Sequence, residues 1–179
     1  MHFQHIVVDN FLNNAEATRA YVLTLPFEVV GNYPGRRSVS FATTELRDAL
    51  ESIVSPLSGR IVDFPMDPSG YNGAFQYTTS RDQSWVHVDG HNNWAGVLFL
   101  TPDAPVSAGT GFFKPRFPDT DLSRDSQDMT KWELVDRVGN VFNRLVLFRG
   151  HMPHRSLDYF GTDVQSGRLF QVFFFSTER

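Results

Sequence analysis

The sequence contains no cysteine, and this absence excludes disulfide bonds, thiolate zinc sites, iron–sulfur clusters and cysteine nucleophiles. Any bound metal must therefore be held by histidine and carboxylate side chains. Lysine and arginine form no run, and the formal net charge at pH 7 is −4, which disfavours nucleic acid as a partner. No secretory leader and no stretch of about 18 apolar residues occurs, so we expect a cytoplasmic protein without a membrane partner.

The residues that are present indicate a folded domain with an aromatic-rich core. Hydrophobic residues make up 41% of the 179, and 17 of them are Phe. A chain of this length forms one domain, so residues 1–179 are expected to fold as a single unit.

The order of sequence patterns predicts a mainly β fold with N-terminal helices. A short strand over 5–12 precedes a helix over 15–25, and apolar residues three and four apart predict a second helix over 43–57. From residue 59 onward, short apolar runs alternate with Gly, Pro, Asn and Asp, which is typical of many short strands. We therefore expect residues 1–58 to give helical support to a β-barrel or sandwich core formed by 59–179.

One interval, 113–132, shows no clear period and is rich in Asp. A long segment of this kind in a compact domain is usually functional or disordered. It is either a solvated excursion between strands or a flap over the opening of a pocket.

The segment SWVHVDGHNNWAG places polar residues at alternate positions of an apolar stretch, at His87, Asp89 and His91. Residues two apart in a strand point to the same side, so His87 and Asp89 are candidates to bind one metal ion. Gly90 makes the alternation unsafe at His91, which is then a pocket-lining or surface residue. Two histidines and one carboxylate form the ligand set of non-haem Fe(II) oxygenases, and HxD alone also occurs on ordinary strand surfaces.

A second histidine pair and an arginine follow downstream. His151 and His154 follow the apolar run NRLVLF, so either can supply a third ligand. Arg168 opens the apolar run RLFQVFFF, where a buried guanidinium requires an anionic partner. A carboxylate fits the fork of an arginine, and Asp158 or Asp163 in the preceding loop is the alternative to a bound anion.

This order of residues resembles the Fe(II)- and 2-oxoglutarate-dependent dioxygenases, especially the prolyl-hydroxylase-like branch. The resemblance covers residues 71–176, and the opening HIVVDNFLNNAEATRAYV is similar to the leader of that branch. It implies a double-stranded β-helix, a jelly-roll and cupin-like barrel. It also implies that His87, Asp89 and His154 bind Fe(II) and that Arg168 binds 2-oxoglutarate.

Two positions in this resemblance leave alternatives open. LVLFRGHMPHRS resembles the family's strand, turn and distal histidine, which favours His154 over His151 as the ligand. The gap between His154 and Arg168 is longer than is usual in the family, because DYFGTDVQSG intervenes. Arg155, directly after the distal histidine, is therefore the competing anchor for 2-oxoglutarate.

Two further residues match positions that the family uses. Tyr77 precedes His87 by ten residues, where relatives often have a tyrosine that contacts the co-substrate; the alternative is a core aromatic residue. Thr110 lies in the turn GTG that resembles the family's Gly-Thr turn.

The implied function is oxygenation of a small-molecule or peptide substrate, with molecular oxygen consumed and 2-oxoglutarate converted to succinate and CO2. Halogenating relatives replace the carboxylate ligand by a small residue, so Asp89 favours hydroxylation of a peptide, amino acid or small metabolite. A cupin-like metal- or sugar-binding module built on His87, Asp89 and His91 is the alternative, and it does not need Arg168. A catalytically inactive interaction domain of the same fold is a third possibility.

Overall fold

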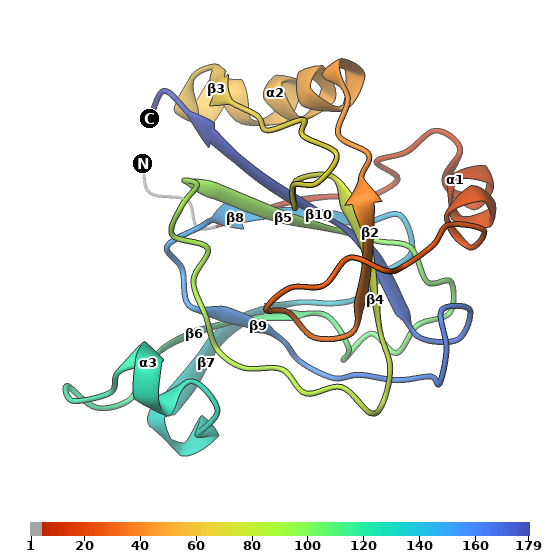
Figure 1. The fold of residues 1–179 in the computed structure, drawn as a ribbon. Coiled ribbons are helices and arrows are strands. Elements are labelled where there is room, and N and C mark those ends of the chain that lie inside the picture. The colour runs from red at the N-terminus through yellow and green to blue at the C-terminus, as the bar shows by residue number, and fades with distance from the viewer. Residues whose placement is uncertain (1–4) are drawn as a thin grey trace.

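The computed structural model describes residues 5–179, which form two antiparallel sheets that face each other (Figure 1). The larger sheet has seven strands in the order β1-β8-β5-β10-β4-β2, with β3 paired to β10, and the smaller sheet has the order β7-β6-β9. The strands are β1 (His5–Val8), β2 (Arg36–Ser40), β3 (Ile61–Asp63), β4 (Ala74–Thr78), β5 (Trp94–Phe99), β6 (Thr110–Pro115), β7 (Trp132–Val138), β8 (Leu145–Arg149), β9 (His154–Ser156) and β10 (Arg168–Thr177). The helical elements are α1 (Ala15–Val22), α2 (Thr44–Ser58), α3 (Leu122–Asp125) and the 3-10 turn η1 (Met129–Lys131).

Helix α2 covers the outer face of the seven-stranded sheet, as the predicted helix over 43–57 requires. Thr43 caps its start, accepting a hydrogen bond of 3.2 Å from the Leu46 amide, and Gly59 ends it at a φ of 79°. Leu50 and Val54 are fully buried and belong to the same core cluster as the outward-facing residues of the sheet. Burial of one stripe of apolar side chains therefore fixes the helix on the sheet.

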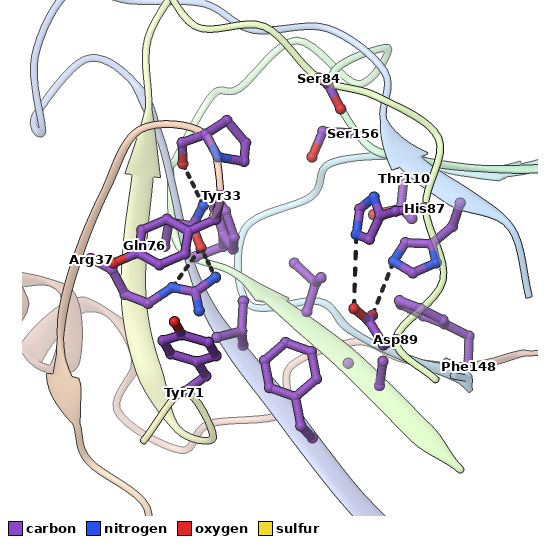
Figure 2. A pocket seen from close by; sticks show the side chains of 18 of the residues that line it. Tyr33, Arg37, Tyr71, Gln76, Ser84, His87, Asp89, Thr110, Phe148 and Ser156 are labelled. Atoms are coloured by element: carbon purple, nitrogen blue, oxygen red, sulfur yellow. Dashed lines mark hydrogen bonds and ion pairs between the residues drawn. The ribbon is translucent and has the colours of Figure 1, made fainter. Parts of the chain in front are cut away.

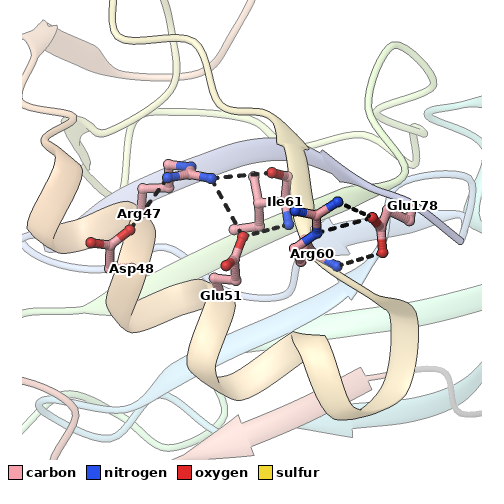
Figure 3. Close-up of polar contacts among 6 residues, drawn as sticks. All are labelled: Arg47, Asp48, Glu51, Arg60, Ile61 and Glu178. Carbon is pink, nitrogen blue, oxygen red and sulfur yellow. Dashed lines mark hydrogen bonds and ion pairs between the residues drawn. The ribbon is translucent and has the colours of Figure 1, made fainter.

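A network of charged side chains ties α2 to the neighbouring strand and to the C-terminal end of β10 (Figure 3). Arg47 lies 3.5 Å from Glu51, and the other contact of the Glu51 carboxylate is the Ile61 amide, which donates at 2.7 Å. Arg60 donates two hydrogen bonds to Glu178, at 3.1 and 3.0 Å. Each exposed ion pair contributes little to the free energy of unfolding. Together, these contacts hold the chain between the end of α2 and the start of β3 in place.

Strand β10 separates the two cores of the molecule by simple alternation. Leu169, Phe173 and Phe175 face α2, whereas Phe170 and Val172 face the smaller sheet. The second core also contains Phe112 of β6, so it lies between the two sheets. Arg168 shares the inward parity of Phe170, which places its guanidinium between the sheets as well.

The predicted mainly β jelly roll is confirmed, in the form of two open sheets. Within the first 58 residues, β1 pairs with β8 and β2 pairs with β4, so this part of the chain adds two edge strands as well as two helices. The helix expected over 15–25 ends at Val22. Among residues 5–179, no helix combines the length and the apolar character that crossing a membrane requires.

Asn143 joins the turn before β8 to the segment that follows β1. Its side chain accepts a hydrogen bond from the Leu12 amide and donates one to the Leu12 carbonyl, both at 2.8 Å, and its φ is 61°. We expect Asn143→Ala to lower the free energy of unfolding by about 2 to 3 kcal/mol, because it removes both hydrogen bonds and leaves a left-handed alanine. Urea denaturation measures this loss. Asn143→Gly should lose about 1 kcal/mol less, and equal losses would show that the backbone conformation contributes nothing.

Candidate active site

A cavity of about 560 Å³ opens between the inner face of the large sheet and strands β6 and β9. Its walls are mostly apolar, with Phe148, Phe170, Val172 and Phe174 facing the interior space. Polar side chains line this wall at three places. The first is the group of His87, His154 and Asp89; the other two, which we call the arginine ends, are the parts of the wall around Arg168 and around Arg37. A mostly apolar cavity with a few convergent polar groups is the usual form of a ligand site.

The backbone brings His87 and His154 together although they are far apart in the sequence. The His87 amide donates to the His154 carbonyl at 3.0 Å, and the His154 amide donates back to the His87 carbonyl at 2.9 Å. This isolated bridge is the only regular pairing of the segment around His87 within residues 5–179, so the strand predicted there is reduced to one residue pair. The bridge is enough to put both imidazoles on one side.

Asp89 is held beside this bridge by a close approach of two chain segments. Its amide donates to the Gly150 carbonyl at 2.7 Å. A Cβ at position 150 would lie 2.2 Å from the Asn92 carbonyl oxygen and 2.8 Å from that of Asp89. Only glycine therefore lets the turn after β8 pass this close to the Asp89 segment.

One ligand atom from each of His87, Asp89 and His154 lies within 4.8 Å of the other two, and Figure 2 shows His87 beside Asp89. Asp89 Oδ1 lies 3.9 Å from His87 Nε2, and Asp89 Oδ2 lies 3.2 Å from His154 Nε2. Metal bonds of about 2.1 Å place two ligands of one ion roughly 3 to 4 Å apart, so these separations suit a shared metal. In each histidine the other ring nitrogen, Nδ1, faces a backbone carbonyl: that of Trp85 at 3.1 Å and that of Met152 at 2.8 Å.

These Nδ1 contacts fix the tautomer that a metal ligand needs, with Nε2 left as an acceptor. Burial, together with the nearby His154, lowers the pKa of His87 to about 4, although its side chain is 41% exposed toward the cavity. Burial alone would raise the pKa of Asp89, but its hydrogen bond to His154 and the charges of His154, His87 and Arg37 lower it below the usual value. A neutral imidazole and an ionised carboxylate are the forms that bind metal.

The segment 113–132 supports this group from behind. The Val86 amide donates to the Ser126 carbonyl at 2.8 Å, and Val86 packs in a small core with Phe113 and Trp132. The Trp132 indole donates to the Asp125 carbonyl at 2.9 Å. None of residues 113–132 lines the cavity. The segment packs against the chain that carries His87, and it does not form a flap over the opening.

The arginine end at Arg168 has unsatisfied hydrogen-bonding capacity. Arg168 is 1% exposed, its Nε donates to the Ala108 carbonyl at 3.0 Å, and its Nη1 has no partner among residues 5–179. The guanidinium carbon lies 4.4 Å from the ring centroid of Phe170, and burial lowers the pKa of Arg168 to about 10. The buried Tyr159 hydroxyl, which also lines the cavity, has no partner in the described chain either. An unpaired buried cation beside an unpaired hydroxyl is a site for an anionic ligand.

The structure brings some of the other predicted residues to the cavity and leaves others out. Thr110 lies on the wall, 2% exposed, and His91 lies at the rim without joining the three convergent side chains. His151 is exposed in the turn between β8 and β9. Arg155 has the opposite parity to His154 on β9, and its Nε donates to the Ser156 carbonyl at 3.0 Å. Neither His151 nor Arg155 lines the cavity.

Tyr77 lies where the alternative for it, a core aromatic residue, would lie, and not where it could contact a co-substrate in the cavity. Its ring packs edge-on against Phe27, 5.1 Å away, in the core beneath α2, and it does not line the cavity. The neighbouring residue, Gln76, faces the cavity instead. The run AFQYT is almost wholly buried, so its burial pattern does not reveal which parity points inward.

Several lining residues had no place in the sequence prediction, namely Tyr33, Arg37, Tyr71, Gln76, Ser156 and Tyr159. Ser156 follows His154 by two residues, so strand alternation could have placed it on the same side. The others come from loops, from β2 (Arg37) and from β4 (Gln76), and no periodic pattern marks them.

No protein-family model and no curated protein matches this chain. Solved structures do match, and they include a protein with 2-oxoglutarate bound, a prolyl hydroxylase and a non-heme α-ketoglutarate-dependent carbocyclase. The fold that the sequence resemblance implied is therefore confirmed, and sequence identities of 11% to 15% limit the likeness to the fold.

Three of these structures illustrate the likeness. HygX from Streptomyces hygroscopicus, solved with nickel and 2-oxoglutarate bound, matches with a TM-score of 0.61 at 12% identity, over 94% of this chain and 81% of HygX. The non-heme α-ketoglutarate-dependent carbocyclase SnoK of nogalamycin biosynthesis gives 0.60 at 15% identity, over 97% and 80%. A prolyl hydroxylase from Trichoplax adhaerens, in complex with a hypoxia-inducible-factor peptide, gives 0.54 at 13% identity, over 96% and 83%.

Proposed function

We propose that this protein is an Fe(II)- and 2-oxoglutarate-dependent oxygenase that hydroxylates a peptide, an amino acid or a small metabolite. The observation that carries the proposal is the joint presence, in one cavity, of the convergent His87, Asp89 and His154 and the unpaired Nη1 of buried Arg168. Two histidines and one carboxylate fit Fe(II). A buried arginine with a free donor fits the far carboxylate of 2-oxoglutarate.

In this proposal each part of the cavity has a separate task. Molecular oxygen would be the oxidant, and Fe(II) with 2-oxoglutarate would activate it, with 2-oxoglutarate oxidised to succinate and CO2. His87, Asp89 and His154 hold the metal, and the carbonyls behind both imidazoles keep Nε2 directed at it. Arg168 and Tyr159 bind and orient the co-substrate, and the apolar wall excludes water from it. Because Asp89 occupies a position that halogenation would need for a halide, hydroxylation is the favoured outcome.

The solved structures that resemble this chain include one with a small molecule bound and one with a peptide bound, so the proposal includes both classes of substrate. HygX is also seen with hygromycin B bound, and the prolyl hydroxylase is seen with a peptide fragment. The alternative of a cupin-like module without oxygenase activity accounts for the histidines and the aspartate. It gives no role to the unpaired donors of Arg168 and Tyr159, so we favour the oxygenase.

Anaerobic titration of the protein with Fe(II) and 2-oxoglutarate tests the proposal. We expect a visible absorption band that requires both components, because 2-oxoglutarate bound directly to Fe(II) gives a metal-to-ligand charge-transfer transition. Zn(II) in place of Fe(II), and His154→Ala protein with Fe(II), should both stay colourless. A spectrum of the Fe(II) protein that does not change on addition of 2-oxoglutarate would exclude the oxygenase.

A further inference from the structure

A second buried arginine lines the same cavity and belongs to a different part of the fold. Arg37 lies on β2 directly opposite Gln76 of β4 and is 5% exposed. It forms no ion pair with any carboxylate in residues 5–179. Burial lowers the pKa of Arg37 to about 10, and the charge of Asp89 acts in the other direction. A buried guanidinium without a counter-ion is costly, so its retention needs a reason.

The surroundings of Arg37 hold one edge of its guanidinium and leave another edge available. Gln76 Oε1 accepts hydrogen bonds from both Nε and Nη2, and the Gln76 amide is itself fixed by donating to the Pro34 carbonyl at 2.6 Å (Figure 2). Nη1 donates to no atom of the described chain. The edge formed by Nη1 and Nη2 can therefore donate two parallel hydrogen bonds to a ligand.

Two tyrosine rings complete this end of the cavity. The guanidinium carbon of Arg37 lies 3.7 Å from the ring centroid of Tyr33 and 4.9 Å from that of Tyr71. The two rings meet edge to face at 5.8 Å, and the Tyr33 hydroxyl donates to the Val29 carbonyl. These contacts hold the guanidinium in one orientation, so little entropy is lost when a ligand binds to it.

Arg37 and Arg168 lie in different parts of the cavity wall, so we assign a separate anionic group to each. Arg168 opens β10 and stands with Tyr159, whereas Arg37 belongs to β2, with β4 between these two strands in the sheet. The carboxylate that acts on Arg37, Asp89, presents its two oxygens to His87 and His154. One cavity thus contains two buried cations, each lacking a protein carboxylate of its own.

We propose that Arg37, oriented by Gln76 and by the rings of Tyr33 and Tyr71, binds a carboxylate group of the substrate that is oxidised. This inference rests on the proposed function, because it assigns 2-oxoglutarate to Arg168 and the substrate to the other end. The planar two-donor edge suits a carboxylate, whose two oxygens can accept both hydrogen bonds. The wall of the same cavity includes Trp85, Val88 and Phe174, so we expect the rest of the substrate to be apolar. The substrate class is an apolar carboxylic acid, either a small molecule or a residue at a peptide C-terminus.

The test is calorimetric titration of the protein loaded with Zn(II), which is redox-inert, and saturating 2-oxoglutarate. The probes are 3-phenylpropionate, its neutral amide and inorganic phosphate. We expect wild-type protein to bind the acid at least tenfold more tightly than the amide, since a charge-assisted pair of hydrogen bonds is lost with the charge. Equal affinity for acid and amide, including binding of neither, would overturn the inference, and so would tighter binding of phosphate than of the acid.

Two variants locate the effect at Arg37. Arg37→Met should remove the preference for the acid while 2-oxoglutarate affinity stays within about twofold, which also shows that the variant folds. Gln76→Glu keeps the arginine, loses the hydrogen bond to the Pro34 carbonyl and supplies a carboxylate of its own, so it should weaken acid binding at least tenfold, with 2-oxoglutarate affinity again the check on folding. Unchanged preference in both variants contradicts the assignment.

Arg168→Met separates failure of this inference from failure of the proposed function. If Arg37→Met loses 2-oxoglutarate binding and Arg168→Met retains it, Arg37 is the co-substrate anchor and the inference is wrong, while the oxygenase proposal stands. If no protein binds 2-oxoglutarate, the oxygenase proposal fails. Acid and amide can then still be compared in metal-free Arg168→Met protein, where Arg37 is the remaining buried cation on the described cavity wall. A dipeptide with an apolar C-terminal residue, set against its C-terminal amide, distinguishes a peptide from a small acid.

Discussion

Replacing His154 by alanine is expected to lower the affinity for Fe(II) by more than about 100-fold and to abolish turnover. Loss of a residue behind a metal ligand typically costs about 10- to 100-fold in affinity, and loss of the ligand itself costs more. His154 is 6% exposed, its Nε2 lies 3.2 Å from Asp89, and its Nδ1 is directed at the Met152 carbonyl. Anaerobic calorimetry with Fe(II), and succinate formation in air, measure the two losses.

The matched control is His151→Ala, three residues earlier, in the turn that precedes β9. His151 is exposed and does not line the cavity, so its loss should change Fe(II) affinity by less than about twofold. Because His154→Ala leaves Asp89 without its closer histidine partner, thermal unfolding of the metal-free variant must also be recorded. A folded His154→Ala protein that still binds Fe(II) as wild type does, or a His151→Ala protein that does not bind it, would reverse the choice between the two histidines.

The cluster of His87, Asp89 and His154 shows how a sequence argument can select residues that lie together although the local structure it assumes is partly wrong. Alternation in a strand predicted that His87 and Asp89 share a side, yet the segment forms only one bridge, at His87. Two features that alternation does not encode keep the side chains together: the paired hydrogen bonds to His154 and the close approach at Gly150. Residue spacing therefore selected side chains that do lie together, whereas tertiary contacts set their geometry.

The limits of the sequence prediction are clearest at the two arginine ends. Arg168 could be predicted because a cation that opens an apolar run is unusual in itself. Arg37 lies in RRSVS, where the neighbouring Arg36 is exposed and gives the same local pattern. Only the pairing of β2 with β4 decides which of the two faces the cavity, and that pairing joins residues about forty positions apart. The same parity problem explains why Gln76, and not Tyr77, lies on the inner side.

Replacing Arg168 by methionine is expected to raise the KM for 2-oxoglutarate by about 100-fold or more, with a smaller effect on kcat at saturation. Removing one partner of a buried charge pair costs about 2 to 5 kcal/mol. The same substitution should leave the melting temperature of the ligand-free protein unchanged or raise it. In that state Arg168 is a buried cation with an unpaired Nη1, and methionine fills similar space between Phe99 and Phe170 without that penalty.

A higher KM for 2-oxoglutarate together with an unchanged or higher melting temperature distinguishes a role of Arg168 in binding from a role in stabilising the fold. If Arg168 served mainly to hold Ala108 through its single hydrogen bond, its loss would destabilise the fold and leave the KM of the surviving protein near that of wild type. Arg155→Met is the matched control, because Arg155 sits on β9 beside the cavity but not on its wall. A rise in KM for Arg155→Met equal to that for Arg168→Met would move the anchor to Arg155. A rise for Arg168→Met alone, with stability kept, would mean that the cost of burying this cation is offset when its anion is bound.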